Sequence, residues 1–102
     1  MVNEATKISI VKNHLNKTWS DEDTDKKVKG IIEDAESYLN HKLGSEIDYF
    51  QPGAERRLFL SYCSYLDNEV GNEFEKDYQN DLNELRRKYA VLARKNGKNS
   101  NI

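Results

Sequence analysis

The densest group of chemically active side chains in the sequence is the acidic run Asp21-Glu22-Asp23-Thr24-Asp25. Closely spaced carboxylate and hydroxyl oxygens are typical of the opening of a calcium-binding loop, which also needs glycine at its sixth position and glutamate at its twelfth. Counted from Asp21, those positions hold Lys26 and Ile32. We therefore interpret the run as a helix N-terminus, where side-chain oxygens cap free backbone N–H groups and carboxylates complement the helix dipole.

The other candidates for metal binding or nucleophilic catalysis are isolated in the sequence. His14 and His41 are the only histidines, and neither has a second ligand at metal-binding spacing. Cys63, the single cysteine, follows Tyr62 in an apolar stretch without a basic group poised to lower the pKa of its thiol, which favours a buried small hydrophobe. Phosphate-loop, hydrolase and kinase signatures are absent. We expect no enzyme activity, no metal site and no cofactor.

Charge is distributed unevenly over the last third of the chain. The net charge of −2 is too small to indicate nucleic-acid or membrane binding by itself. Residues 67–84 are rich in acids with one base, Lys76, whereas residues 85–102 contain bases and no acid. These bases could bind phosphates, pair with an acidic protein surface, or simply complement a helix dipole. The candidate partner interface comprises Arg86, Arg87, Lys88, Arg94 and Lys95.

Hydrophobic periodicity predicts an all-α fold, a small four-helix domain with a long C-terminal helix. The clearest helix follows the acidic cap and ends before Gly44, which can adopt the left-handed cap conformation. Further helices are expected over residues 6–16, 54–68 and 73–95. The domain should span residues 1–95, followed by a disordered tail over 96–102. The last helix carries apolar residues at nearly heptad spacing, which requires a partner surface: Phe74, Tyr78, Leu82, Leu85, Tyr89 and Leu92.

Two apolar features lie outside these helices. The loop over residues 45–53 carries Ile47, Tyr49 and Phe50 before the turn signal Pro52-Gly53. Such a loop either folds onto the core or contacts a neighbouring subunit or partner, and the sequence leaves both alternatives open. Trp19 is expected to fold back and close one end of the core.

The sequence predicts neither secretion nor a membrane span. Its N-terminus has no basic start followed by an apolar run, and no stretch approaches the ~20 apolar residues of a span. A single cysteine fits a reducing compartment. We expect the protein to be made in the cytoplasm.

Three segments in order carry a family resemblance. The first is the acidic cap and the helix after it, with the pattern D-x-x-V-x-x-I-I-x-x-A-x-x-Y-L over residues 25–39. The second is RRLFLSYCSYL over residues 56–66, and the third is NEFEKDY over residues 72–78. Together they resemble the head–tail connector (adaptor) proteins of long-tailed bacteriophages and of prophages in Gram-positive bacteria. The resemblance covers about residues 5–92.

This resemblance implies an assembly role in the virion after synthesis in the host bacterial cytoplasm. Such adaptors form a ring, commonly dodecameric, beneath the portal protein, extend the DNA channel, and dock the stopper or head-completion protein. DNA would pass through the channel without sequence-specific binding, and no membrane would be involved. In this family the C-terminal helix and tail often dock against the portal, which implies that role for residues 85–95.

Two other classes of protein fit parts of the sequence. A small helical DNA-binding regulator or antitoxin would use the basic C-terminal segment and bind DNA with steep salt dependence. Against it, the loop over residues 45–53 is longer than the turn of about three or four residues in a helix-turn-helix. A module whose heptad seam pairs with itself would form a stable dimer in isolation.

Overall fold

The computed structural model describes residues 2–18 and 21–100, with side chains as far as Lys95. The all-α class is confirmed, and the described residues contain no strand. Trp19 lies outside the described residues. In chain order the elements are α1 (Glu4–His14), α2 (Glu22–Leu43), α3 (Ala54–Asp67), the 3-10 turn η1 (Gly71–Glu73), α4 (Phe74–Asp77) and α5 (Gln79–Ser100).

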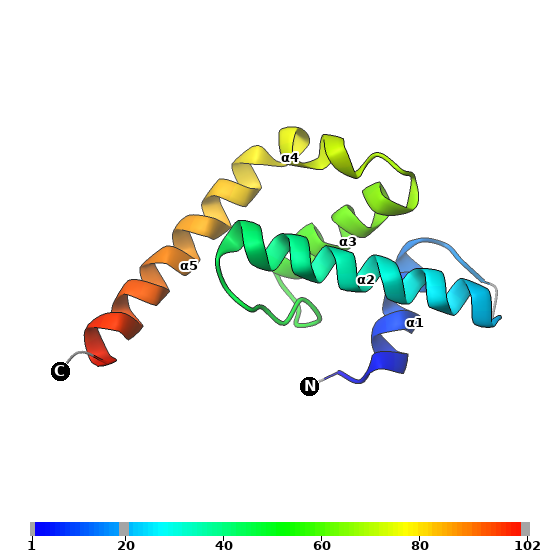
Figure 1. Ribbon diagram of the computed structural model, residues 1–102, viewed down its shortest axis with the longest axis horizontal. Coiled ribbons are helices and arrows are strands. Elements are labelled where there is room, and N and C mark those ends of the chain that lie inside the picture. The colour runs from blue at the N-terminus through cyan, green and yellow to red at the C-terminus, as the bar shows by residue number, and fades with distance from the viewer. Residues whose placement is uncertain (1, 19–20, 101–102) are drawn as a thin grey trace.

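Helix α2 is the central element, and both of its ends follow from the sequence (Figure 1). Asp21 accepts a 2.6 Å hydrogen bond from the backbone N–H of Thr24, which confirms the capping interpretation of the acidic run. Gly44 ends the helix at φ 70°, where its N–H donates to the carbonyl of Asn40. One face of α2 is buried against α1 and α3 through Val28, Ile31, Ile32, Ala35, Leu39 and Leu43.

The loop between α2 and α3 folds onto the core. Tyr49 is fully buried and stacks on Phe59 of α3, with ring centroids 5.1 Å apart, and Phe50 packs edge-on against the same ring. Asn40 of α2 accepts hydrogen bonds from the Tyr49 hydroxyl and from the backbone N–H of Ile47. Of the two alternatives for this loop, packing onto the core is the one that the structure has. Tyr49 and Phe50 are therefore not available as a partner contact, and Ile47 is half-buried.

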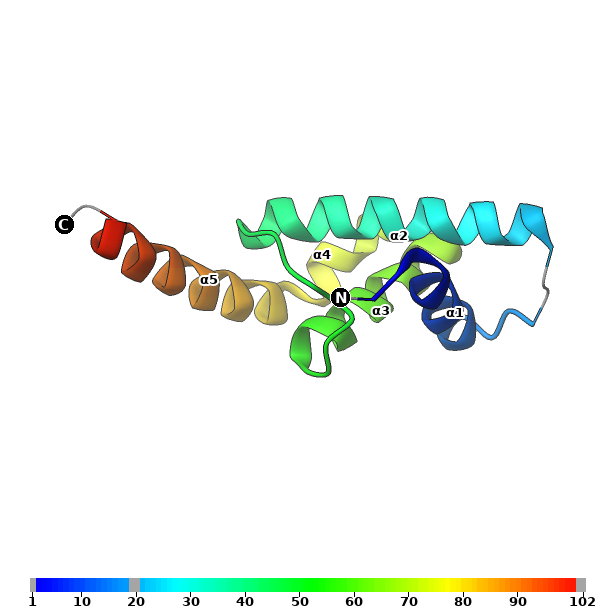
Figure 2. The same cartoon turned by 90° about the horizontal axis from the view of Figure 1, so that it is seen from below.

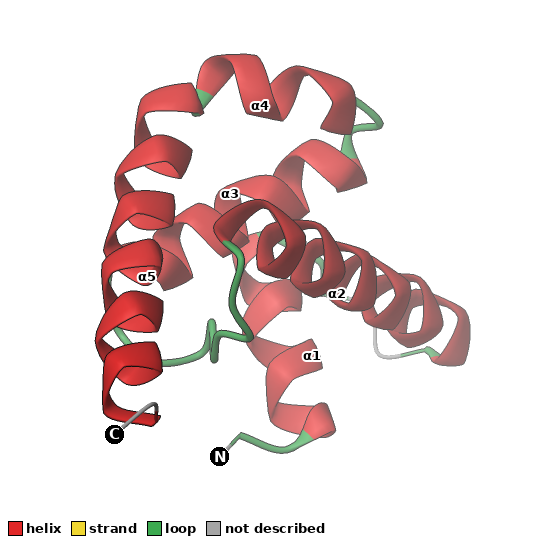
Figure 3. Ribbon diagram, turned by 60° about the vertical axis from the view of Figure 1, so that its left-hand side comes forward, coloured by secondary structure: helices red, strands yellow, loops and turns green. Residues whose placement is uncertain are grey.

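The expected helix over residues 73–95 is divided at Tyr78, whose φ of −113° and ψ of 22° leave the helical region. The division arises because Phe74 is fully buried among aromatic rings of α2 and α3, which fixes α4 across the end of α3 (Figure 3). Just before this point, the backbone at Gly71 lies close to the side chain of Leu66 at the end of α3. A Cβ at Gly71 would lie 3.0 Å from a methyl group of Leu66.

Helix α5 projects from the body of the molecule. The helix is described as far as Ser100, and residues 101–102 of the expected tail lie outside the described residues. Its burial declines along the chain, from Leu82 in the core, through half-buried Leu85 and Tyr89, to Leu92 at 43% exposed. Figures 1 and 2 show the C-terminal half of α5 clear of the other helices. The row of apolar residues at nearly heptad spacing is thus covered by the rest of the molecule only in its first half.

Candidate protein interface

The five basic residues predicted as a partner interface all lie exposed on α5. Residues seven apart are separated by about two helical turns and share a side of the helix. Arg87 and Arg94 therefore form one row, and Lys88 and Lys95 form another. Arg86, Arg87, Arg94 and Lys95 take part in no ion pair among the described residues.

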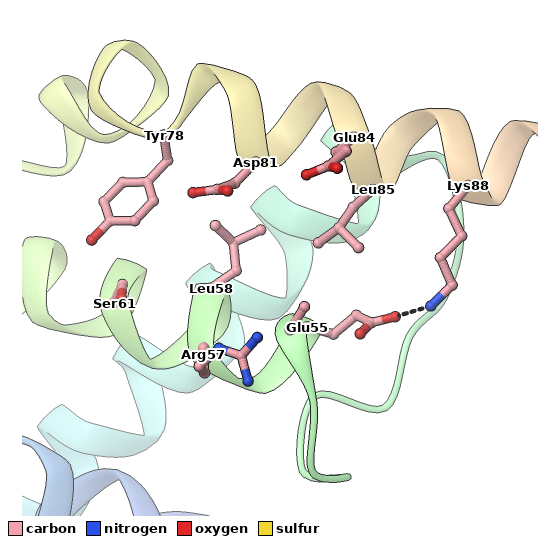
Figure 4. A pocket seen from close by; sticks show the side chains of 10 residues that line it. Glu55, Arg57, Leu58, Ser61, Tyr78, Asp81, Glu84, Leu85 and Lys88 are labelled. Carbon is pink, nitrogen blue, oxygen red and sulfur yellow. Dashed lines mark hydrogen bonds and ion pairs between the residues drawn. The ribbon is translucent and has the colours of Figure 1, made fainter.

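Lys88 has a different role, because it ties α5 to the start of α3. Its Nζ lies 2.7 Å from Oε2 of Glu55 (Figure 4). The same oxygen also accepts a 2.6 Å hydrogen bond from the Tyr89 hydroxyl. These two bonds lower the pKa of Glu55 to about 2, and burial together with the bond to Glu55 raises the pKa of Tyr89 to about 12. We call Glu55, Lys88 and Tyr89 the clasp. Sequence reasoning missed Glu55.

The clasp should make stability depend on acidity. A carboxyl whose pKa falls from 4.5 to about 2 on folding stabilises the folded state above pH 4.5, and this contribution is lost as the pH drops toward 2. We expect the free energy of unfolding of the wild type to fall more steeply over that range than that of Glu55→Gln. Urea titrations followed by circular dichroism at several pH values measure the difference.

A matched control for this prediction is Glu46→Gln. Glu46 is exposed and takes part in no described ion pair, so this variant should follow the wild-type pH profile. Parallel profiles for the wild type and Glu55→Gln would show that the clasp contributes nothing to stability.

A groove of about 580 Å³ runs between α3 and α5, beside the clasp (Figure 4). Leu58 of α3 and Leu85 of α5 face each other across it, with the Tyr78 ring at one end. Its α5 side carries Asp81 and Glu84, neither of which takes part in an ion pair among the described residues. Acidic side chains thus flank an apolar groove on one side.

Ion pairs elsewhere connect neighbouring helices. Lys7–Glu36, Lys12–Asp25 and Lys29–Glu4 join α1 to α2 at 2.9 to 3.2 Å, and Lys42–Glu75 joins α2 to α4 at 2.6 Å. Each exposed pair contributes only about 0–1 kcal/mol, but together they engage four lysines of the body. The cations at the end of α5 stand apart from these networks.

The residues considered for metal or thiol chemistry are separate in the structure. His14 ends α1 and His41 lies in the last turn of α2. Cys63 is fully buried, and burial raises the pKa of its thiol to about 12, which confirms its interpretation as a small hydrophobe. Among the described residues, no three metal-ligating side chains gather at one place. None of the described helices is both long and apolar enough to cross a membrane.

The fold and this surface define a small all-α protein with a projecting, cationic C-terminal helix. Comparison of the chain with family models, curated proteins and solved structures gives no match. The resemblance carried by the sequence motifs and the geometry of α5 and its groove are therefore the observations that bear on function.

Proposed function

We propose that this protein is a head–tail connector (adaptor) of a long-tailed bacteriophage or prophage. It would form a ring beneath the portal protein, extend the DNA channel, and dock the stopper protein. The observation that carries the proposal is the end of α5, which projects from the body and carries cations without partners in the described chain. A helix that extends beyond its own core is suited to reach a second protein.

The row formed by Arg87 and Arg94, with Arg86 beside it, is the part of α5 that we assign to the portal. These side chains are exposed and point away from the groove side of the helix, since Asp81, Leu85 and Lys88 mark that side. Arginine forms bidentate hydrogen bonds with carboxylates, so an acidic portal surface is the matching partner. Lys88 is excluded from this assignment because Glu55 already engages it.

The direct test is to mix the purified protein with portal rings of its parent phage or prophage and image the mixture by negative-stain electron microscopy. We expect an added layer of density on one end of the portal, absent from portal alone. Bare portals at high protein concentration would overturn the adaptor proposal. Salt-dependent DNA binding would then be measured next, because the basic segment is also the feature that a DNA-binding regulator would use.

The variant Arg86→Glu/Arg87→Glu should remove the added layer. It reverses two exposed cations without touching the clasp or the core, so the fold should persist by circular dichroism. The matched control is Lys26→Glu/Lys27→Glu, which makes the same charge change at the start of α2 and should still form the layer. If the α5 variant decorates portals as well as the control does, these arginines are merely solvated.

A further inference from the structure

The end of α5 has an apolar surface that the described chain leaves uncovered. Val91 and Leu92 are each 43% exposed, and they are the exposed large hydrophobic side chains of the described residues. Leu92 follows Leu85 by about two helical turns, so it continues the side of α5 that lines the groove. Val91 is separated from Leu92 by about 100° around the helix axis. The side of α5 that α3 covers near Leu85 is therefore bare at Leu92.

The groove between α3 and α5 has the complementary character. Its apolar lining comprises half-buried Leu85, half-buried Tyr78 and the edge of Leu58, which is itself only 4% exposed. Its α5 side carries Asp81 and Glu84 without ion-pair partners in the described chain. Arg57 lies on the α3 side, so the acidic side chains without partners are confined to one edge. This groove can accept an apolar surface flanked by positive charge on the matching edge.

The end of α5 is itself such a surface. Lys95 lies about one turn beyond Leu92 on the same side of the helix, and residues 85–102 contain no acid. Apolar contact and opposite charge therefore match at the same time. The two complementary surfaces are the end of α5 and the groove between α3 and α5. Because every copy of the chain carries both surfaces, the partner that fits is a second copy.

We propose that the end of α5 of one copy occupies the groove between α3 and α5 of a second copy. Leu92 then lies against Leu85 and the exposed edge of Leu58, and Lys95 pairs with Asp81 or Glu84. Because the end and the groove are different surfaces, the contact is head-to-tail, and repeated contacts close into a ring when the rotation between copies allows it. The inference rests on the proposed ring and names the contact between its neighbouring subunits.

The first test is the oligomeric state of the full chain in the absence of portal. Sedimentation velocity over a concentration series that reaches the millimolar range should show the average mass rising beyond that of two copies. Leu92→Glu should weaken this association by about tenfold or more, because it places a charge in the apolar contact and beside acidic residues. Ala90→Glu is the control, because Ala90 is exposed and lies on the opposite side of α5 from Leu92, and it should associate as the wild type does.

A charge exchange gives the sharper test. The variant Asp81→Lys/Glu84→Lys and the variant Lys95→Glu should each lose self-association, because like charges then meet in the contact. An equimolar mixture of the two should associate again, because each groove then finds an end of opposite charge. A monomeric wild type at every concentration, an association that stops at two copies, or a mixture that stays monomeric would overturn the proposal.

These outcomes are separable from those of the portal experiment. The self-association assay contains no portal, and its variants leave Arg86 and Arg87 intact. A protein that decorates portals but never self-associates retains the adaptor function and loses this contact. A protein that self-associates but leaves portals bare retains the contact and loses the adaptor function.

Discussion

Replacing Phe59 with alanine is expected to lower the free energy of unfolding by about 3–5 kcal/mol. Phe59 is fully buried, stacks on Tyr49 at 5.1 Å and meets Phe50 edge-on at 5.2 Å, so its removal leaves a cavity between α3 and the loop. The total stability of a domain is typically about 5–15 kcal/mol, and a domain of this size lies toward the lower end. Urea denaturation followed by circular dichroism should show a large population of unfolded protein without denaturant or a sharply reduced midpoint.

The control for this prediction is Val91→Ala, which shortens an exposed apolar side chain on α5. It should change the free energy of unfolding by no more than about 0.5 kcal/mol, as surface substitutions usually do. A loss below about 1 kcal/mol for Phe59→Ala would show that the loop does not pack on Phe59 as the structure has it.

Replacing Phe74 with alanine is expected to release α4 and α5 while α1, α2 and α3 stay folded. Phe74 is fully buried, and its ring centroid lies 4.6 to 6.3 Å from those of Tyr38, Tyr62, Tyr65 and Tyr78. Its removal costs about 3–5 kcal/mol. Apart from Phe74, α5 is held mainly by Leu82, Leu85 and the clasp. The substitution should therefore chiefly lower the free energy of local opening of α4 and α5.

Hydrogen exchange measures that local opening. Amides of residues 79–89 should lose protection in Phe74→Ala far more than amides of α2. The matched control is Tyr65→Phe, which keeps a ring beside Phe74 and removes only the exposed hydrogen bond from Tyr65 to Asp77, so its exchange pattern should resemble that of the wild type. Equal loss of protection in α2 and α5 would contradict the separation of the two parts.

The parts of the fold that were predictable are those fixed by local interactions. Asp21 and Gly44 bound α2 because capping involves only residues within one turn of the chain. The division at Tyr78 was not predictable, because it depends on Phe74 reaching rings on α2 and α3. The heptad spacing continues through Tyr78, so periodicity alone favours one unbroken helix.

The same distinction separates the site residues. Charge segregation along the sequence identified the cations of α5, which are exposed as expected. Glu55 could not be recognised beforehand, since it lies 33 residues before Lys88 and meets it only when α3 and α5 lie side by side. The packing of the loop was equally hard to predict, because it depends on Asn40 of α2 accepting hydrogen bonds from the Tyr49 hydroxyl and the Ile47 N–H.

The complete burial of the single cysteine makes the natural chain well suited to site-specific labelling. Cys63 exposes no surface, and its thiol, with a pKa of about 12, is almost entirely protonated at neutral pH, so maleimide reagents should leave the folded protein unmodified. A cysteine introduced at an exposed site on α5 would then be the one that reacts. A fluorophore placed there would report when the end of α5 meets another protein, with every native residue of the core still in place.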